Sequence, residues 1–246
     1  MIACGRNSSA VINSDGKLMT TGSNKKGQIG HGPSISKWYF ETPDCVQDVC
    51  FSYVDCFDGH MAAVDVDGRL FVTGGCFYGQ LGIGYSDAKY GFQFLGDWRS
   101  AGKGNSQKMM VHVEKSEICG VMHAPLNGER VSIVACGDMH TIALTVTGRA
   151  WSTGFNYFGQ LGLGDGISRY SFDEILQENF AKHAQHDCRV VNVVAGESYS
   201  MMLCQNGNIF SCGRNSSGEL GIGDSEDREL PTLVEELFGI HVVGIS

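Results

Sequence analysis

The chain has 246 residues, enough for one large domain or two small ones. Hydrophobic residues make up 42 % of it, so a sizeable core can form, and 18 Lys and Arg face 27 Asp and Glu, for a formal charge of −9. This acidic balance argues against a nonspecific nucleic-acid binder, which needs a basic surface. The chain holds 34 glycines and 4 prolines. Glycine well above the ordinary ~7 % with so little proline indicates many tight turns between short strands.

Two kinds of segment are missing from the sequence. The first residues, MIACGRNSSA, lack the basic start and apolar stretch of a signal peptide. No apolar run is long enough to cross a membrane as a helix.

The ten cysteines include no C-x-x-C pair. We therefore expect free thiols and a cytoplasmic or nuclear protein, since reducing compartments keep cysteines reduced.

Four segments of the chain read alike, and each predicts a strand, a tight turn and a second strand. In chain order the turns are Asp15-Gly16, Asp67-Gly68, Thr147-Gly148 and Asn206-Gly207. Asp-Gly and Asn-Gly turns between apolar stretches are the strongest short-range signal for a β-hairpin. Each second strand ends at a glycine, and a glycine-rich motif follows: GQIGHG, GQLGIG, GQLGLG and GELGIG. Three glycines in six residues indicate a backbone bent tightly against a neighbouring sheet.

A second stretch lies upstream of each turn: IACGRNSSAVI, VDCFDGHMAAV, VACGDMHTIAL and VAGESYSMMLC. Small antiparallel sheets of this size cannot bury both faces alone, so the units have to stack. Together with G-Q-L-G-x-G, these columns resemble the repeat of the regulator of chromosome condensation family. The resemblance covers essentially the whole chain and implies an all-β β-propeller with four-stranded blades. We expect one domain over 1–246, with repeats at about 2–53, 54–133, 134–192 and 193–246.

The four repeats leave the closure of the propeller open, because members of this family usually close a ring of seven blades. The last residues, HVVGIS, match the short strand that precedes each later repeat, as in FSYV, VSIV and VNVV. They therefore predict a strand that pairs beside the first strand and closes a four-blade ring. Two alternatives stay open. Two chains can associate into eight blades, or the four repeats can be a fragment of a larger propeller.

The second repeat carries a long insertion, at about 85–129. It holds five Lys and Arg residues, Arg99 among them, together with Trp98. A long excursion from a regular scaffold is either functional or a tolerated surface loop. We take Trp98 and Arg99 as candidate contacts for a partner.

One repeat column contains residue types that occur in catalytic sites. Asp58, Asp138 and Glu197 each stand two residues before His60, His140 and Tyr199. Carboxylate and imidazole together can perform acid–base catalysis, but a unit repeated in this way is better explained by local hydrogen bonds that every blade needs. By resemblance, histidines of this column lie near the face that binds a GTPase in the exchange-factor member of the family. These six residues are therefore our leading candidates for partner contact.

Several other chemistries find little support. No nucleophile–base–acid set, phosphate-binding loop or cofactor motif is present, so we predict no cofactor and no catalytic residue. His183, His186 and Cys188 lie close in sequence but lack a fourth zinc ligand. The exchange-factor member uses an acidic residue in a Phe-Arg-Asp loop after the strand-end glycine. The corresponding loops here read SNKK, GCFY, FNYF and RNSS and supply no acid.

These observations favour a scaffold that binds a protein partner through propeller loops. The alternative is guanine nucleotide exchange on a small Ran-like GTPase. Chromatin binding ranks third, because the chain has no basic arm. Self-association is expected if the ring stays open, since an open end exposes a blade face and sheet edges.

Overall fold

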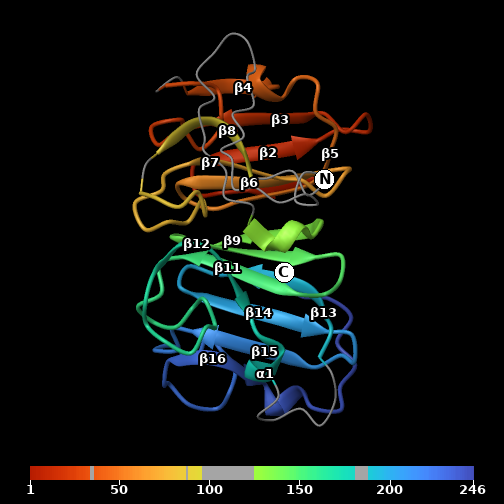
Figure 1. Ribbon diagram of the computed structural model, residues 1–246, viewed down its shortest axis with the longest axis vertical. Helices are drawn as coiled ribbons and strands as arrows, with labels where there is room; N and C mark the ends of the chain where they lie inside the picture. Colours follow the sequence, from red (N-terminus) through yellow and green to blue (C-terminus); the bar gives the residue numbers. More distant parts are fainter. Residues whose placement is uncertain (34–35, 87, 96–124, 181–187) are drawn as a thin grey trace, which may run out of the picture.

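The computed structural model describes residues 1–33, 36–86, 88–95, 125–180 and 188–246. These residues form four antiparallel four-stranded sheets, each made of four strands that are consecutive in sequence. We call the sheets blades 1 to 4 in chain order (Figure 1). The all-β architecture of four-stranded blades predicted from the repeats is confirmed.

The strands of the blades are short, and the innermost comes first in each. Blades 1 and 2 contain β1 (Ile2–Cys4), β2 (Ser8–Ile12), β3 (Leu18–Gly22), β4 (Lys37–Glu41), β5 (Phe51–Cys56), β6 (His60–Asp65), β7 (Leu70–Gly74) and β8 (Lys89–Leu95). Blades 3 and 4 contain β9 (Val131–Cys136), β10 (His140–Thr145), β11 (Ala150–Gly154), β12 (Arg169–Ile175), β13 (Val190–Ala195), β14 (Tyr199–Cys204), β15 (Ile209–Gly213) and β16 (Arg228–Leu233). Four short helical segments lie between or after them: η1 (Asp44–Val46), η2 (Pro125–Gly128), α1 (Gln177–Phe180) and η3 (Glu235–Leu237).

Side-chain hydrogen bonds shape the loops that the repeats share. In the hairpin of blade 2, the Asp65 carboxylate accepts bonds from the amides of Asp67 (3.0 Å) and Arg69 (2.8 Å). Gly68 then adopts a φ of +82°, which a residue with a Cβ rarely takes.

A buried asparagine holds the glycine-rich motif in three of the four blades. The side-chain oxygen of Asn156 accepts a hydrogen bond from the Leu161 amide (2.9 Å), and its amide group donates to the Asp165 carbonyl (2.7 Å). Asn24 and Asn215 make the corresponding pairs of bonds. Blade 2 has Cys76 in this column, and its thiol donates to the Tyr85 carbonyl instead (3.5 Å).

The blades stack in order, and each joint is apolar. The substantial contacts between blades link β5 with β1 and β2, β9 with β5 and β6, and β13 with β9 and β10. We call the face of a blade that contacts the preceding blade its leading face, and the opposite one its trailing face. Val134, Ala143 and Trp151 on the leading face of blade 3 pack against Val64 and Leu70 on the trailing face of blade 2. The other two joints have their own buried clusters of apolar side chains.

Each joint also contains a ring or apolar side chain seated on a glycine of the preceding blade. A Cβ added at Gly30 would lie 2.6 Å from the Phe92 ring, and one at Gly82 would lie 2.4 Å from the Phe172 ring. At the third joint, Pro231 lies 3.3 Å from such a Cβ at Gly162. The second glycine of the G-Q-L-G-x-G motif is therefore required because the next blade fills the space of its side chain.

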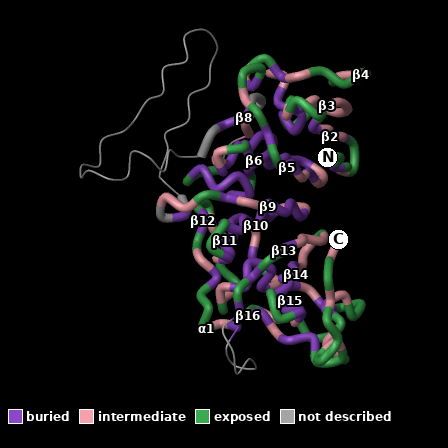
Figure 2. Tube along the Cα trace, turned by 90° about the vertical axis from the view of Figure 1, so that its right-hand side faces the viewer, coloured by how far each residue is buried: buried purple, intermediate pink, exposed green. Residues whose placement is uncertain are grey.

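The arrangement of the blades is an open arc. Blade 1 and blade 4 lie at opposite ends of the long axis of the molecule (Figure 1). Within the described residues, the substantial contacts between elements include none between these two blades. In Figure 2 both termini lie on the same side of the molecule, which is the side where the arc is open.

The predicted closure of the ring by terminal strand pairing is wrong for this structure. β1 pairs with β2, and no strand of the described chain follows β16. Instead the last residues turn back onto blade 4, where Val242 and Ile245 pack beside Leu203, Ile209 and Val234. Val242 and Ile245 repeat the spacing of Val131 and Val134, which cover the trailing face of blade 2. The C-terminal residues thus lie where the first strand of a following blade would lie, and their apolar pair explains this position.

The expectation that all thiols are free is also wrong. Cys188 and Cys204 form a disulfide, with 5.5 Å between their Cα atoms. The register of blade 4 pairs Val190 with Cys204, which brings the preceding Cys188 next to it. Among the described residues, seven cysteines remain free. No helix in the described part of the chain has the length and apolarity needed to cross a membrane.

Candidate partner-binding face

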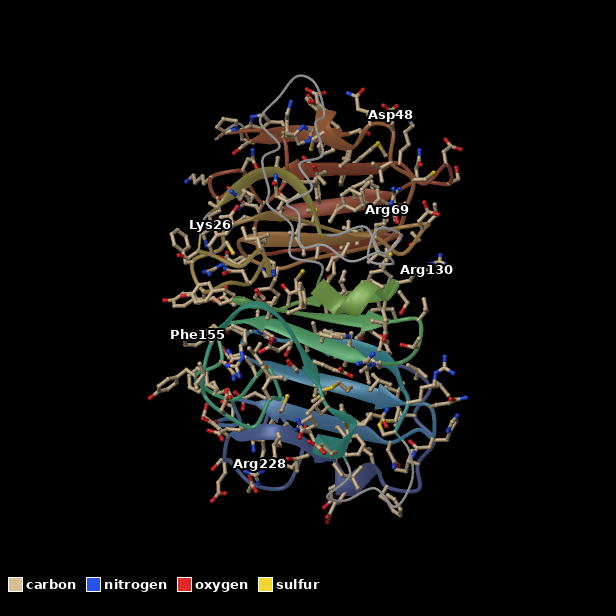
Figure 3. All side chains as sticks on the ribbon, in the orientation of Figure 1. Lys26, Asp48, Arg69, Arg130, Phe155 and Arg228 are labelled. Atoms are coloured by element: carbon tan, nitrogen blue, oxygen red, sulfur yellow. A yellow bond between two sulfur atoms is a disulfide. The ribbon has the colours of Figure 1, made fainter. Side chains whose placement is uncertain are left out.

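Two loops of each blade meet at one edge of the arc. The loop after the first strand and the loop after the third strand are joined by backbone hydrogen bonds. Gly75 donates to Gly59 (2.8 Å), and Phe155 donates to Met139 (2.8 Å). Lys26 and Phe155, both from loops after third strands, project from this edge, whereas Arg69 and Arg130 project from the opposite one (Figure 3). The blades therefore hold these loops in fixed positions on a single face, which we call the loop face.

The carboxylates of the predicted column lie together on the loop face. Asp58 forms an ion pair with Lys26 of the preceding blade (2.6 Å). The Asp138 amide donates to the Glu197 carbonyl (3.2 Å), so the loops of blades 3 and 4 are in contact. Partial burial raises the pKa of Asp138, and the nearby carboxylates of Asp58 and Glu197 raise it further, against the opposing effect of Lys26. We call Asp58, Asp138 and Glu197 the acidic rim.

His60 and His140 do not belong to the accessible surface. Both rings are completely buried between blades. His60 Nε2 lies 2.8 Å from the Thr141 hydroxyl, and His140 Nε2 lies 3.0 Å from the Ser200 hydroxyl. Burial lowers the pKa of His60 to about 3 and that of His140 to about 4, so both rings are neutral near pH 7. Their prediction as contact residues is corrected: each ring connects its own blade to the next.

The remaining predicted candidates differ in position. Glu197 is exposed, and Tyr199 is half-buried at the start of β14. Trp98 and Arg99, with most of the 85–129 insertion, lie outside the described residues.

The loop face also carries an aromatic cluster that was not predicted from the sequence. Tyr78 packs edge-on against Phe155, with ring centroids 5.0 Å apart, and this contact joins blades 2 and 3. Phe155 then stacks with Tyr157 (6.3 Å), and Tyr157 meets Phe158 edge-on (5.2 Å). The Arg214 guanidinium of blade 4 lies over the Phe158 ring, 5.8 Å from its centroid. With Phe77, these rings form what we call the aromatic ridge.

The aromatic ridge is accessible to a partner. Phe77 is 69 % exposed and Tyr157 is 73 % exposed. Exposed aromatic side chains grouped in this way mark interaction sites, because isolated apolar residues are common on surfaces and clusters are not. Beside the ridge, a hollow is lined by Tyr157 and Phe158 together with Asp227, Arg228, Glu229 and Leu230 of blade 4. Carboxylates of blade 4 therefore adjoin the aromatic rings.

A signal for the ridge is present in the sequence. The loops GCFY and FNYF place Phe77 and Tyr78 in the same columns as Tyr157 and Phe158. Large aromatic residues in corresponding loop positions of two neighbouring repeats lie on the same face of a propeller. The equivalent loops of blades 1 and 4, SNKK and RNSS, lack aromatic residues.

No group of metal-ligating side chains occurs among the residues that the structure describes. Of the three residues considered for zinc, Cys188 is in the disulfide, and His183 and His186 lie outside the described residues.

Comparison with known proteins agrees with the repeat assignment. Models of the regulator of chromosome condensation (RCC1) repeat match residues 206–246 and residues 2–28, 131–160 and 190–219. These ranges contain strands from blades 1, 3 and 4. These stretches of the chain are RCC1-type repeats. The ultraviolet-B receptor UVR8 of Arabidopsis thaliana is 26 % identical over 96 % of this chain. The human E3 ubiquitin-protein ligase HERC2 is 28 % identical over 94 % of it.

Solved structures agree on the fold. Prp20p from Saccharomyces cerevisiae superposes on 95 % of the chain with a TM-score of 0.66 and 18 % identity. Human WBSCR16 superposes on 95 % of it with a TM-score of 0.55 and 23 % identity. The RCC1-type chain spans only part of these proteins: 58 % of UVR8, 4 % of HERC2 and 50 % of the Prp20p chain.

Proposed function

We propose that this RCC1-type chain is a protein-interaction scaffold that binds its partner through the loop face. The observation that carries the proposal is the aromatic ridge, whose rings span blades 2 and 3 and include the exposed Phe77 and Tyr157. Large aromatic residues supply most of the binding energy in protein interfaces when a partner buries them. The rigid loops reduce the ordering that binding requires.

The surroundings of the ridge favour a partner segment that combines apolar and cationic side chains. The acidic rim lies in loops that are hydrogen-bonded to those of the ridge, and Asp227 and Glu229 line the hollow beside the ridge. A lysine or arginine can be attracted to these carboxylates and to the ring faces at once. The formal charge of −9 would also speed the approach of a basic partner.

Guanine nucleotide exchange is the second candidate. The fold it shares with Prp20p supports this candidate, because Prp20p has binding properties toward Gsp1p and histones. The loops SNKK, GCFY, FNYF and RNSS weigh against it, since they lack the acid of the exchange-factor member. For either function we propose a cytoplasmic or nuclear location.

Affinity capture with matched variants tests the scaffold proposal. Phe77→Ser combined with Tyr157→Ser removes the two most exposed rings of the ridge. The control is Val66→Ser combined with Val146→Ser, which changes two exposed residues in turns at the opposite edge, where the Arg130 guanidinium bonds to the Val66 carbonyl. We expect the ridge variant to lose partners that the wild type and the control retain, with affinity reduced about 100-fold or more for two hot-spot residues. Equal capture by all three proteins would contradict the proposal.

A charge reversal in the acidic rim tests the preference for a basic partner, and a nucleotide-release assay tests the second candidate function. Asp138→Lys should weaken the binding of a captured basic partner, and the effect should diminish in high salt.

A Ran-type GTPase loaded with fluorescent GDP reports exchange directly. Accelerated GDP release by the wild type would favour the second candidate over a simple scaffold.

A further inference from the structure

The leading face of blade 1 has no blade against it, although its residues match the buried leading faces of the other blades. Ile2 of β1 is 74 % exposed, whereas its counterparts Val54, Val134 and Val193 are at most 1 % exposed. In register with Ile2, Val11 and Met19 continue the apolar row across β2 and β3. Both are only half-buried, whereas Ala63 and Phe71 in the same row of blade 2 are buried.

The apolar row ends at an aromatic ring that no preceding blade covers. Phe40 of β4 is the counterpart of Phe92 and Phe172, the two rings that seat on glycines of a preceding blade. It is 45 % exposed, against 2 % for Phe92 and 5 % for Phe172. Blade 1 therefore presents the apolar row and the ring with which blades 2 and 3 dock onto their neighbours.

The trailing face of blade 4 presents the matching glycines. Gly221 is the counterpart of Gly30, Gly82 and Gly162, and it has the same left-handed backbone, with a φ of +68°. A Cβ at Gly221 would have only Val234 near it, at 3.7 Å. At Gly218 such a Cβ would meet nothing within 4 Å, whereas at its counterpart Gly159 it would lie 2.4 Å from Glu229 of the next blade. The space that the other joints fill is thus open here.

The polar groups of the two faces match as well. At the joint between blades 2 and 3, Thr141 donates to the Gln80 carbonyl (2.7 Å) and Thr153 donates to the Gly79 carbonyl (2.9 Å). At the next joint, Ser200 donates to the Gln160 carbonyl (2.7 Å). In blade 1 the two hydroxyl columns hold Ser9 and Thr21, and in blade 4 the carbonyl columns hold Glu219 and Gly218. Both donors and both acceptors of a joint are therefore present at the open ends.

We propose that a second copy of this chain occupies these faces, with blade 1 of each copy docked on blade 4 of the other. A second copy fits these faces because they carry the two sets of residues that already pack together at the three joints within one chain. The two open faces lie at opposite ends of the long axis, and both termini lie on the same side (Figures 1 and 2). Two such arcs related by a twofold axis can form both joints at once, so the assembly closes as a dimer. This proposal is independent of the function proposed for the loop face.

Docking requires a local displacement. In each copy Val242 and Ile245 cover the inner part of the trailing face of blade 4. Ile2 of the second copy would take the place of Ile245, so residues 242–246 have to move aside. A hydrogen bond from the Asn192 side chain to the Ile245 carbonyl (3.2 Å) holds this segment to blade 4. The segment is thus a weakly held competitor for the joint.

Sedimentation velocity over a wide range of protein concentration tests the proposal. The wild type should reach a discrete species of twice the 26.6 kDa of one chain. Phe40→Ala removes the seated ring from both joints and should raise the dissociation constant about 30-fold or more. Phe77→Ala is the matched control, because it removes an exposed ring from the loop face and should leave the dissociation constant unchanged. Far-ultraviolet circular dichroism checks that both variants stay folded.

A shortened chain that ends at Gly239 sharpens the test. It removes the competing segment, so it should dimerise more tightly than the wild type. A wild type that stays monomeric at the highest concentration overturns the proposal and leaves these faces to another occupant. A dimer that Phe40→Ala and Phe77→Ala weaken equally, or a mass that grows without limit, overturns it as well.

Discussion

The joint between blades 2 and 3 and the open ends of the arc use the same residue columns in different surroundings. In the joint, Phe172 is 5 % exposed and seats on Gly82. At the open ends, Phe40 is 45 % exposed, and a Cβ at Gly221 would meet only Val234, at 3.7 Å. The comparison separates two roles of the repeat motif. The glycines and their asparagine shape the loop within each blade, whereas burial of the aromatic ring depends on a neighbouring blade.

The largest contrast is expected for the two phenylalanines. Phe172→Ala should lower the free energy of unfolding by about 3–5 kcal/mol, because it opens a cavity in a buried joint. Phe40→Ala should lower that of the monomer by less than about 1 kcal/mol, because the ring already contacts solvent. Urea denaturation at a concentration where the protein is monomeric gives both values. Similar losses for both variants would show that the two ends are equally packed.

The glycines give a second matched pair. Gly82→Ala combines a left-handed backbone with a Cβ placed 2.4 Å from the Phe172 ring. We expect it to cost about 2–5 kcal/mol, from backbone strain of ~1–2 kcal/mol and overpacking of ~1–3 kcal/mol. Gly221→Ala has nearly the same backbone strain without the clash and should cost about 1–2 kcal/mol. Thermal unfolding of both variants distinguishes the two contributions, and a Gly221→Ala as unstable as Gly82→Ala would contradict the open end.

The buried histidines predict a dependence on pH. Their pKa values in the folded protein, about 3 for His60 and about 4 for His140, lie below the ordinary 6.5. The unfolded chain therefore takes up these protons first, and stability falls as the pH drops below 6.5. Lowering the pH from neutral to about 5 should therefore reduce the free energy of unfolding by about 2 kcal/mol for each histidine.

Denaturation curves of the His60→Gln variant isolate this effect. Glutamine keeps a polar group near the Thr141 hydroxyl and does not titrate. Its free energy of unfolding should fall by about 2 kcal/mol less than that of the wild type between neutral pH and about pH 5. Asp55 has the opposite effect on stability in the wild type and in the variant. Burial raises its pKa in the folded protein to about 6, so the folded protein binds this proton more tightly than the unfolded chain and gains stability as the pH falls. Parallel pH profiles of the two proteins would rule out the assigned role of His60.

Most of the fold can be predicted from the sequence because the repeat columns encode local structure. The Asp-Gly and Asn-Gly turns define the hairpins, and the glycine-rich motif indicates the close approach of a neighbouring sheet. Ring closure could not be predicted in the same way. HVVGIS has the pattern of an inner strand, but pairing with β1 and packing on blade 4 satisfy that pattern equally. The outcome depends on three-dimensional proximity, and Val242 and Ile245 find the nearer apolar face.

The candidate site was predicted in part. Asp58, Asp138 and Glu197 do lie together on the loop face, as a shared repeat position implies. The adjacent histidines point the other way, into the joints, because the Thr141 and Ser200 hydroxyls of the following blade provide partners for them. A side chain two residues from a half-buried carboxylate in a tight turn can face either direction. The aromatic ridge was missed because its rings come from two repeats and meet only after the blades have stacked.

Hydrogen exchange resolved by strand tests the open arc most directly. At a concentration where the protein is monomeric, the amides of β1 and of residues 242–245 should exchange much faster than those of β9, which lies inside a joint. The Phe40→Ala variant should show the same order. Protection of β1 equal to that of β9 in the monomer would mean that the chain closes on itself, and it would contradict the account of unused blade faces.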